Sequence, residues 1–277
     1  MKYQTFGKTG LEISKIALGT WGMGGCGWDN YDEEIKADAV AAAVESGINL
    51  IDTAPAYNGG EAERFLGRTI EKLGIRDKIY ISTKCGNRFV NGSTYVRDGS
   101  YDFINQQCNE SLANLRTDHI DIMLIHWPDV NTPFEETFRA LEDLKAAGKI
   151  LHYGVSNFTI EQMEEVAPYS NIEAYQPPYS MVDRSQEDRI IYASGKNMGV
   201  MTYGSLGGGI LTGRFRQLTQ FDAIDSRNRF YKHFKEPMFS KVMELLAVMD
   251  DISARNDGLP LSQIALLWSA QKPFVNT

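Results

Sequence analysis

Short apolar runs alternate along this chain with longer amphipathic stretches, and this alternation limits the folds available to it. Some runs are apolar almost throughout, as in Ile-Asp-Ile-Met-Leu-Ile at 120–125, which is typical of a strand covered on both faces. We predict strands at Lys15–Thr20, Ile48–Asp52, Lys78–Lys84, Ile120–His126, Ile150–Ser156, Ile172–Gln176 and Gly199–Tyr203. Helices are predicted between them at Glu33–Ser46, Gly60–Lys72, Tyr101–Leu115, Pro133–Ala147, Thr159–Ala167 and Gln186–Lys196.

Strict alternation of strand and helix predicts a parallel sheet, because each parallel strand needs a crossover connection to the next. This many strand–helix units exceed the usual doubly wound sheet, so we predict an α/β fold, a closed parallel (β/α)8 TIM barrel. The length of 277 residues fits one such domain, residues 1–277. Tyr3–Phe6 and Glu12–Ser14 flank the turn Lys8-Thr9-Gly10 and are expected to form an N-terminal β-hairpin.

The last part of the sequence departs from this regularity. A long loop follows Tyr203, and helices are then expected at about Pro237–Ala254 and Leu261–Ala270. Phe274–Thr277 begins an eighth strand, so we expect the eighth βα unit to be incomplete within these residues.

The charge balance bears on the partners of the protein. The chain has 28 Lys and Arg against 36 Asp and Glu, a formal net charge of -8, which disfavours binding to nucleic acid or anionic membrane. Met1–Gly10 holds no apolar run typical of a signal peptide, and no stretch approaches the ~20 apolar residues of a membrane span. We therefore expect a cytoplasmic protein with a small-molecule partner. The sequence does not determine its oligomeric state.

The cysteines and histidines favour neither a disulfide framework nor a metal centre. The chain has 3 cysteines, an odd number: Cys26, Cys85 and Cys108. We therefore predict free thiols, and because no CxxC pair occurs, we predict no structural zinc. A metal-dependent barrel hydrolase or lyase that uses His126 and Asp52 is an alternative. Only 4 histidines occur, however, and no predicted strand carries an HxH pair, so we predict no metal site.

Four polar residues fall at or just after predicted strand ends: Asp52, Tyr57, Lys84 and His126. In parallel barrels the reactive groups lie at the carboxyl ends of the strands and in the loops that follow. Each residue alone has an ordinary structural explanation, such as a turn for Asp52 or core packing for His126. Their matching positions in consecutive units instead favour one shared site above the barrel.

This set of side chains suits the protonation of an oxygen on which negative charge develops. A phenol has a pKa near 10, and an adjacent ammonium such as that of Lys84 lowers it. Asp52 can hold Lys84 in place and balance its charge. A neutral His126 can donate a hydrogen bond to a carbonyl oxygen and polarise it.

Five motifs of the chain resemble the aldo-keto reductase superfamily, in its order and at its spacings. They are Asp52–Gly67 (DTAPAYNGGEAERFLG), Ser82-Thr83-Lys84, Leu124–Asp129 (LIHWPD), Gly154–Phe158 (GVSNF) and Tyr203–Gly213 (YGSLGGGILTG). The resemblance implies reduction of an aldehyde or ketone by NADPH, with NADH as the alternative cofactor. It also implies that Tyr57 is the general acid, that Lys84 and Asp52 support it, and that His126 orients the carbonyl.

The resemblance implies a cofactor site in addition. Ser156, Asn157 and Gln176 would hold the nicotinamide carboxamide, and Tyr203 would stack on the ring. The other implied residues are Thr20, Trp21 and Asp52 at the nicotinamide, Gly204, Ser205, Leu206 and Gly208 at the pyrophosphate, and Arg214, with Arg227 less directly, at the phosphates. Relatives often have Tyr-Ser-Pro-Leu where this chain has Tyr-Gly-Ser-Leu, which makes the loop more flexible. No Rossmann GxGxxG fingerprint occurs, so the dinucleotide is expected to bind at the barrel top.

The chain also resembles, to a lesser degree, the β subunits of voltage-gated potassium channels. A nicotinamide-binding regulatory subunit is therefore the alternative function. Aromatic residues near the predicted barrel mouth indicate a partly aromatic substrate pocket, with core packing as their competing explanation: Trp21, Trp28, Phe89, Trp127 and Phe158.

Overall fold

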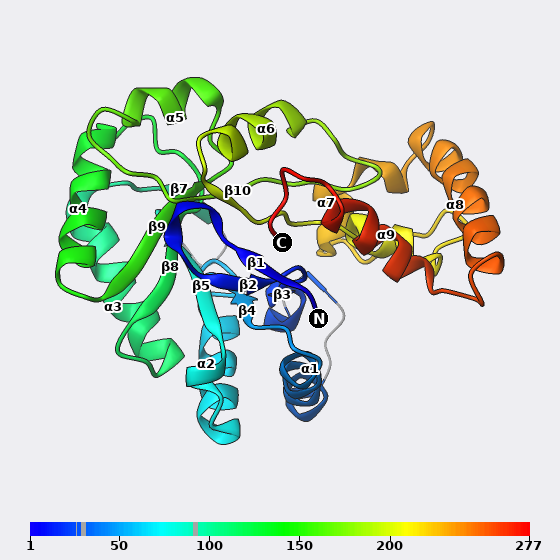
Figure 1. The fold of residues 1–277 in the computed structure, drawn as a ribbon, viewed down its shortest axis with the longest axis horizontal. Helices are drawn as coiled ribbons and strands as arrows, with labels where there is room; N and C mark the ends of the chain where they lie inside the picture. Colours follow the sequence, from blue (N-terminus) through cyan, green and yellow to red (C-terminus); the bar gives the residue numbers. More distant parts are fainter. Residues whose placement is uncertain (26, 29–31, 91–93) are drawn as a thin grey trace.

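The computed structural model describes residues 1–25, 27–28, 32–90 and 94–277. Its main sheet has 7 parallel strands in the order β11-β10-β9-β8-β5-β4-β3. The strands run at Leu18–Gly19 (β3), Leu50–Asp52 (β4), Tyr80–Cys85 (β5), Ile120–Ile125 (β8), Ile150–Ser156 (β9), Ala174–Gln176 (β10) and Gly199–Val200 (β11). The sheet curls in the centre of the molecule, with helices around it (Figure 1).

The surrounding helices follow the predicted alternation. They are α1 (Glu33–Glu45), α2 (Glu61–Leu73), α3 (Tyr101–Leu115), α4 (Phe134–Ala146), α5 (Ile160–Val166) and α6 (Glu187–Gly195). Each begins and ends within a few residues of the predicted bounds. The Thr159 hydroxyl caps α5 by accepting from the Gln162 backbone N–H, and the Gln162 side chain accepts from the Thr159 N–H in return.

Alternation along the strands divides the core into two layers. In β8, Ile122 and Leu124 belong to a cluster inside the barrel, whereas Met123 and Ile125 pack into the larger cluster between sheet and helices. In β4, Leu50 and Ile51 divide in the same way. Successive strand side chains point to opposite faces, so an almost entirely apolar strand supplies both layers.

The predicted N-terminal hairpin is confirmed as β1 (Tyr3–Thr5) and β2 (Glu12–Ser14), which pair antiparallel. Phe6 follows β1 and is fully buried in the cluster inside the barrel. A Cβ on Gly199, the first residue of β11, would lie 2.5 Å from Phe6 Cγ. The hairpin therefore packs directly on the amino end of the sheet.

Two parts of the fold differ from the prediction. A second hairpin, β6 (Asn87–Val90) with β7 (Thr94–Arg97), follows β5, and β11 ends at Val200 instead of Tyr203. Tyr203 still pairs with Pro178 as an isolated bridge. The neighbouring segment contains Pro177 and Pro178, which have no N–H to donate, so the ladder stops there.

The C-terminal part forms a cluster of its own to one side of the barrel (Figure 1). It comprises α7 (Ser226–Phe230), α8 (Met238–Ala254) and α9 (Leu261–Ala270). The last residues then run beside β11, where the backbone N–H groups of Asn276 and Thr277 donate to the Val200 carbonyl. The chain thus enters the position predicted for the eighth strand. That residues 1–277 form one domain stays a prediction.

Cys85 and Cys108 are buried free thiols, as predicted, whereas Cys26 lies outside the described residues. Among the helices that the structure describes, none is both long and apolar enough to cross a membrane.

Candidate active site

Lys84 stands at the centre of the predicted site. It lies near the end of β5 with a side chain only 1% exposed. Its ammonium Nζ donates to Asp52 Oδ2 at 2.6 Å, to the Thr53 carbonyl at 2.8 Å and to Tyr57 Oη at 3.2 Å. Burial acts to lower the pKa of Lys84, but the Asp52 carboxylate and the Tyr57 hydroxyl outweigh it and raise this pKa above its ordinary value. Lys84 is therefore a buried, fully hydrogen-bonded cation.

Tyr57 lies in the loop between β4 and α2. Its N–H donates to the Ala54 carbonyl at 3.0 Å, and Asn58, next along, has a φ of 52°. This tight turn returns the Tyr57 side chain over the end of β5. Burial raises the pKa of Tyr57, and the nearby Lys84 cation offsets only part of this rise. The predicted lowering by Lys84 is present but burial outweighs it, so Tyr57 keeps its proton at neutral pH.

His126 follows β8 and faces the ring of Tyr57. The two ring centroids are 6.1 Å apart with an interplanar angle of 87°. Burial, followed by the positive charges of Lys84 and Arg97, lowers the pKa of His126 well below 6.5. The imidazole is therefore neutral at physiological pH and carries one N–H.

A hydrogen-bonded chain of polar groups extends from Asp52 across the barrel mouth. Gln176 Nε2 donates to Asp52 Oδ1 at 2.9 Å, and the Gln176 carbonyl accepts from Ser156 Oγ at 2.8 Å. Asn157 Nδ2 donates to Ser156 Oγ at 2.9 Å, and Tyr203 Oη donates to Asn157 Oδ1 at 2.9 Å. The structure thus joins the predicted reactive residues and the predicted nicotinamide residues in one network.

The polar groups and the glycine loop fit a nicotinamide dinucleotide. Thr20, predicted to line this pocket, is fully buried, and its hydroxyl has no hydrogen-bond partner among the described residues. Gly204 has a φ of 73° and Gly208 a φ of 64°, and a Cβ on Gly208 would lie 2.9 Å from the Tyr231 ring. The loop therefore needs glycine at these two positions.

The predicted phosphate-binding arginines lie in different surroundings. Arg214 is exposed just after the glycine loop and lies over the Phe215 ring. Arg227 is buried, and its Nη2 pairs with Asp225 Oδ2 at 2.6 Å. Its guanidinium also lies 4.4 Å from the centroid of the Phe221 ring. Arg227, in α7, is thus held by residues of the segment that precedes this helix.

The predicted aromatic residues divide between pocket and core. Trp21 stacks beside Tyr57 with a centroid distance of 6.2 Å and meets the edges of Trp28 at 5.0 Å and Phe230 at 5.4 Å. Phe158, in contrast, is fully buried, with its ring 5.4 Å from that of Phe134, so core packing is the correct explanation for it. Phe230 was not predicted from the sequence, because α7, which it ends, has only 5 residues, too short a run to show a periodic pattern.

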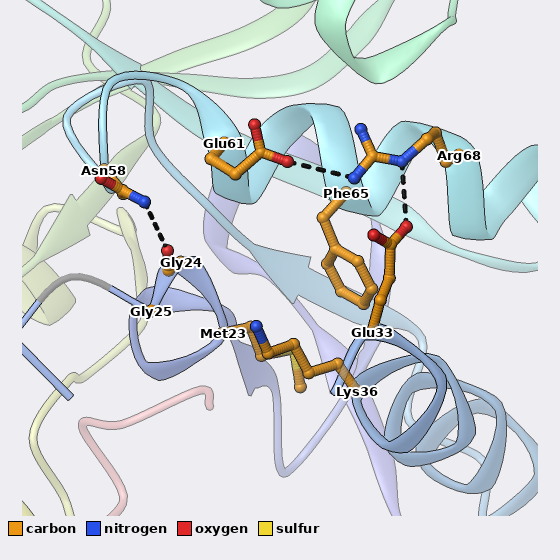
Figure 2. Close-up of a pocket in the computed structure, with 9 residues that line it drawn as sticks. All are labelled: Met23, Gly24, Gly25, Glu33, Lys36, Asn58, Glu61, Phe65 and Arg68. Atoms are coloured by element: carbon orange, nitrogen blue, oxygen red, sulfur yellow. Dashed lines mark hydrogen bonds and ion pairs between the residues drawn. The ribbon is translucent and has the colours of Figure 1, made fainter. Parts of the chain in front are cut away.

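A cavity of about 270 Å³ lies on the outer side of the Tyr57 loop, between α1 and the start of α2 (Figure 2). Across it, Arg68 bonds to Glu33 and Glu61 at 3.0 Å each. Asn58 Nδ2 donates to the Gly24 carbonyl at 2.8 Å and so ties the Tyr57 loop to the segment that carries Trp21. The residues that line the cavity do not include Lys84, Tyr57 or His126.

In the part of the chain that the structure describes, no group of three His, Cys, Asp or Glu side chains is placed to hold a metal ion. Asp52, one of the pair considered for a metal-dependent barrel, accepts from Lys84 and Gln176. His126, the other, faces the ring of Tyr57.

Comparison with known proteins identifies the family of this barrel. A sequence model of the aldo/keto reductase family matches residues 15–277. The chain is 36% identical over 274 residues to the aldo-keto reductase YhdN of Bacillus subtilis, covering 99% of the chain and 82% of that protein. The structure of a glycerol dehydrogenase from Gluconobacter oxydans matches with a TM-score of 0.87 and 33% identity, covering 96% of this chain and 82% of that one.

The chain therefore belongs to the aldo/keto reductase family. It has the (β/α)8 barrel fold of that family and is an oxidoreductase that reduces small carbonyl compounds with NADPH or NADH. The chain is also similar, at 29% identity over its whole length, to a probable voltage-gated potassium channel β subunit of Arabidopsis thaliana. The predicted family and the predicted class of reaction are confirmed.

Proposed function

We propose that Tyr57 is the general acid of this reductase. The observation that carries the proposal is the position of Lys84 Nζ, which contacts Tyr57 Oη at 3.2 Å and Asp52 Oδ2 at 2.6 Å at once. When bound, the nicotinamide supplies the hydride for the carbonyl carbon. Tyr57 gives its proton to the carbonyl oxygen, and the ammonium of Lys84 stabilises the phenolate that remains.

In this proposal His126 orients the substrate. Its neutral ring donates its N–H to the carbonyl oxygen and lowers the energy of the negative charge that develops there. A protonated imidazole would compete with Tyr57 as the acid, and the low pKa of His126 prevents this. Asp52 is a positioning residue, because it acts by holding Lys84.

We assign the cofactor to the other half of the barrel mouth. Ser156, Asn157 and Gln176 would hold the carboxamide, Tyr203 would stack on the ring, and Thr20 and Trp21 would line its other side. The backbone N–H groups of the loop at Gly204, Ser205, Leu206 and Gly208 would hold the pyrophosphate, and the exposed Arg214 a phosphate beyond it. The connected network from Asp52 to Tyr203 supports this placement.

A pair of variants tests these roles. Tyr57→Phe removes the hydroxyl alone and is expected to lower kcat by ~10²–10⁴-fold while the Kd for NADPH stays the same. Lys84→Met is expected to be as damaging, and the double variant little worse, because the two residues act as one unit. The measurements are steady-state reduction of an aldehyde and titration of NADPH fluorescence. Near-full turnover by Tyr57→Phe would exclude the assignment.

The same titration, made with NADPH and with NADH, chooses between the cofactors. The reduction assay chooses between the two functions. We propose NADPH as the cofactor, with NADH as the alternative, and titration with each shows which one binds more tightly. A channel subunit without turnover would bind nicotinamide but reduce none of several aldehydes, and we expect this chain to reduce them. A cytoplasmic location stays a prediction from the sequence.

A further inference from the structure

The β6–β7 hairpin stands beside the two loops that carry the reactive residues. Tyr95 Oη, on β7, donates to the Ala56 carbonyl at 2.8 Å, next to Tyr57. The guanidinium of Arg97, at the end of β7, lies 4.9 Å from the centroid of the Trp127 ring, and Trp127 directly follows His126. The hairpin thus contacts the Tyr57 loop with one residue and the His126 loop with another.

Arg97 keeps most of its hydrogen-bonding capacity for a ligand. Its Nη1 donates to Asn87 Oδ1 at 2.8 Å, and no carboxylate of the described residues forms an ion pair with it within 4.0 Å. Asp129, the carboxylate that acts on Arg97 at longer range, already accepts from the Gly99 N–H at 2.9 Å and from Thr132 Oγ1 at 2.7 Å. A guanidinium has five N–H donors, and Asn87 takes only one of those of Arg97. A planar group such as a carboxylate can therefore still pair with the other N–H groups.

The other arginine of this hairpin is arranged differently. Arg88, on β6, forms an ion pair with Asp98 and lies 4.5 Å from the centroid of the Phe103 ring. Its charge is balanced within the protein, whereas the charge of Arg97 is not. Arg88 is therefore a matched control for Arg97.

The positive charge of Arg97 also acts on the reactive residues. After burial and Lys84, it is the third cause of the lowered pKa of His126. The protein as a whole carries a formal net charge of -8 and repels anions, so an anionic substrate would need a local cation of this kind near the site. The exposure of Arg97 leaves it accessible to such a substrate.

We propose that Arg97 binds a carboxylate of the substrate, so that this enzyme prefers carbonyl compounds that carry a carboxylate over their uncharged analogues. The proposal rests on the function proposed for Tyr57 and His126. The carboxylate pairs with the open edge of the Arg97 guanidinium, which the Trp127 ring supports from one face. The carbonyl group then reaches toward Tyr57 and His126.

The test compares each acid with its own methyl ester. The probes are 4-oxobutanoate and 4-carboxybenzaldehyde, which place the carboxylate at two distances from the aldehyde. With saturating NADPH, the ratio of kcat/KM for acid over ester is expected to exceed one in at least one pair. Arg97→Gln is expected to lower this ratio by roughly 10- to 100-fold, the usual contribution of a charge-assisted hydrogen bond. Arg97→Lys should keep part of the ratio, because it keeps the charge but not the planar fork.

Controls distinguish substrate recognition from a structural role. Arg88→Gln should leave the ratio unchanged, and thermal melting should show that each variant is folded. A wild-type ratio of one or less for both pairs, or equal losses for acid and ester in Arg97→Gln, would overturn the proposal. Failure of the proposed function has a different signature, namely near-full turnover of the esters by Tyr57→Phe.

Discussion

At the scale of single residues, burial and charge compete at Tyr57 and Lys84. Burial raises the pKa of Tyr57, whereas Lys84 lowers it by a smaller amount. For the ammonium of Lys84 the balance is reversed, because the Asp52 carboxylate and the Tyr57 hydroxyl together outweigh burial and raise its pKa. The pair is thus held with a neutral phenol beside a charged ammonium, which is the protonation state that a proton donor needs before reaction.

These directions predict the pH dependence of reduction. The role proposed for Tyr57 requires its acid form, and because burial raises the pKa of Tyr57 above its ordinary value of about 10, this form is lost only at high pH. His126 contributes no transition near pH 6.5, because its pKa lies well below that value. The value of kcat/KM for reduction, measured from about pH 6 to pH 11 with saturating NADPH, should therefore stay level to about pH 9 and then fall.

Two outcomes would contradict this prediction. A transition near pH 6.5 would mean that His126 titrates in the working enzyme. A fall in kcat/KM that begins near pH 8 would mean that Lys84 lowers the pKa of Tyr57 more than burial raises it. The variant His126→Asn separates the two, because it removes only a transition that belongs to the imidazole.

The sequence was sufficient to predict that Asp52, Tyr57, Lys84 and His126 lie together, but not what surrounds them. Asp52, Lys84 and His126 stand at strand ends, where a parallel barrel gathers its reactive groups, so their meeting follows from topology. The side chain of Arg97 lies in a hairpin whose register the strand–helix pattern does not specify. Trp21, whose ring stacks beside that of Tyr57, comes from a segment far away in the sequence.

At the scale of elements, the strands and helices of the barrel were predictable because their periodicity is strong. The β6–β7 hairpin was missed, although Asn91-Gly92 between Arg88-Phe89-Val90 and Tyr95-Val96-Arg97 is a common hairpin signal in a sequence. The early end of β11 depends on prolines in the neighbouring segment, which the pattern of β11 itself does not reveal.

Close helix packing gives a prediction at this scale. Gly67 lies on α2 where α2 meets the end of α3, and a Cβ there would lie 2.2 Å from the Asn114 carbonyl oxygen. Since backbone cannot yield as a flexible side chain does, Gly67→Ala should lower the free energy of unfolding by about 1–3 kcal/mol. Urea unfolding followed by circular dichroism measures this change.

Gly195, the last residue of α6, provides the matched control. It is also helical, but a Cβ on it would meet nothing within 4 Å. Gly195→Ala should therefore be neutral or stabilise the protein by up to about 1 kcal/mol, because alanine restricts the unfolded chain more than glycine. Similar effects of the two substitutions would show that the approach of α2 to α3 is not close enough to require glycine.

At the scale of the whole molecule, the barrel has two ends with different tasks. The carboxyl ends of the strands carry the residues proposed to react, and the N-terminal hairpin packs on the amino ends. Phe6 is a main contact between hairpin and barrel, buried with Ile122 and Leu124 in the inner cluster. Residues on this side are expected to affect stability rather than catalysis.

Phe6→Ala should therefore cost about 3–5 kcal/mol of the free energy of unfolding, because it leaves a cavity in the inner cluster. Phe89→Ala makes the same chemical change at a side chain that is 46% exposed, and it should cost less. Well below its melting temperature, Phe6→Ala should keep the NADPH affinity and kcat of the unchanged protein, because the hydrophobic residues of the inner cluster that the structure describes include none of the proposed site. A large loss of kcat with little loss of stability would mean that the amino end of the barrel is coupled to the reactive residues.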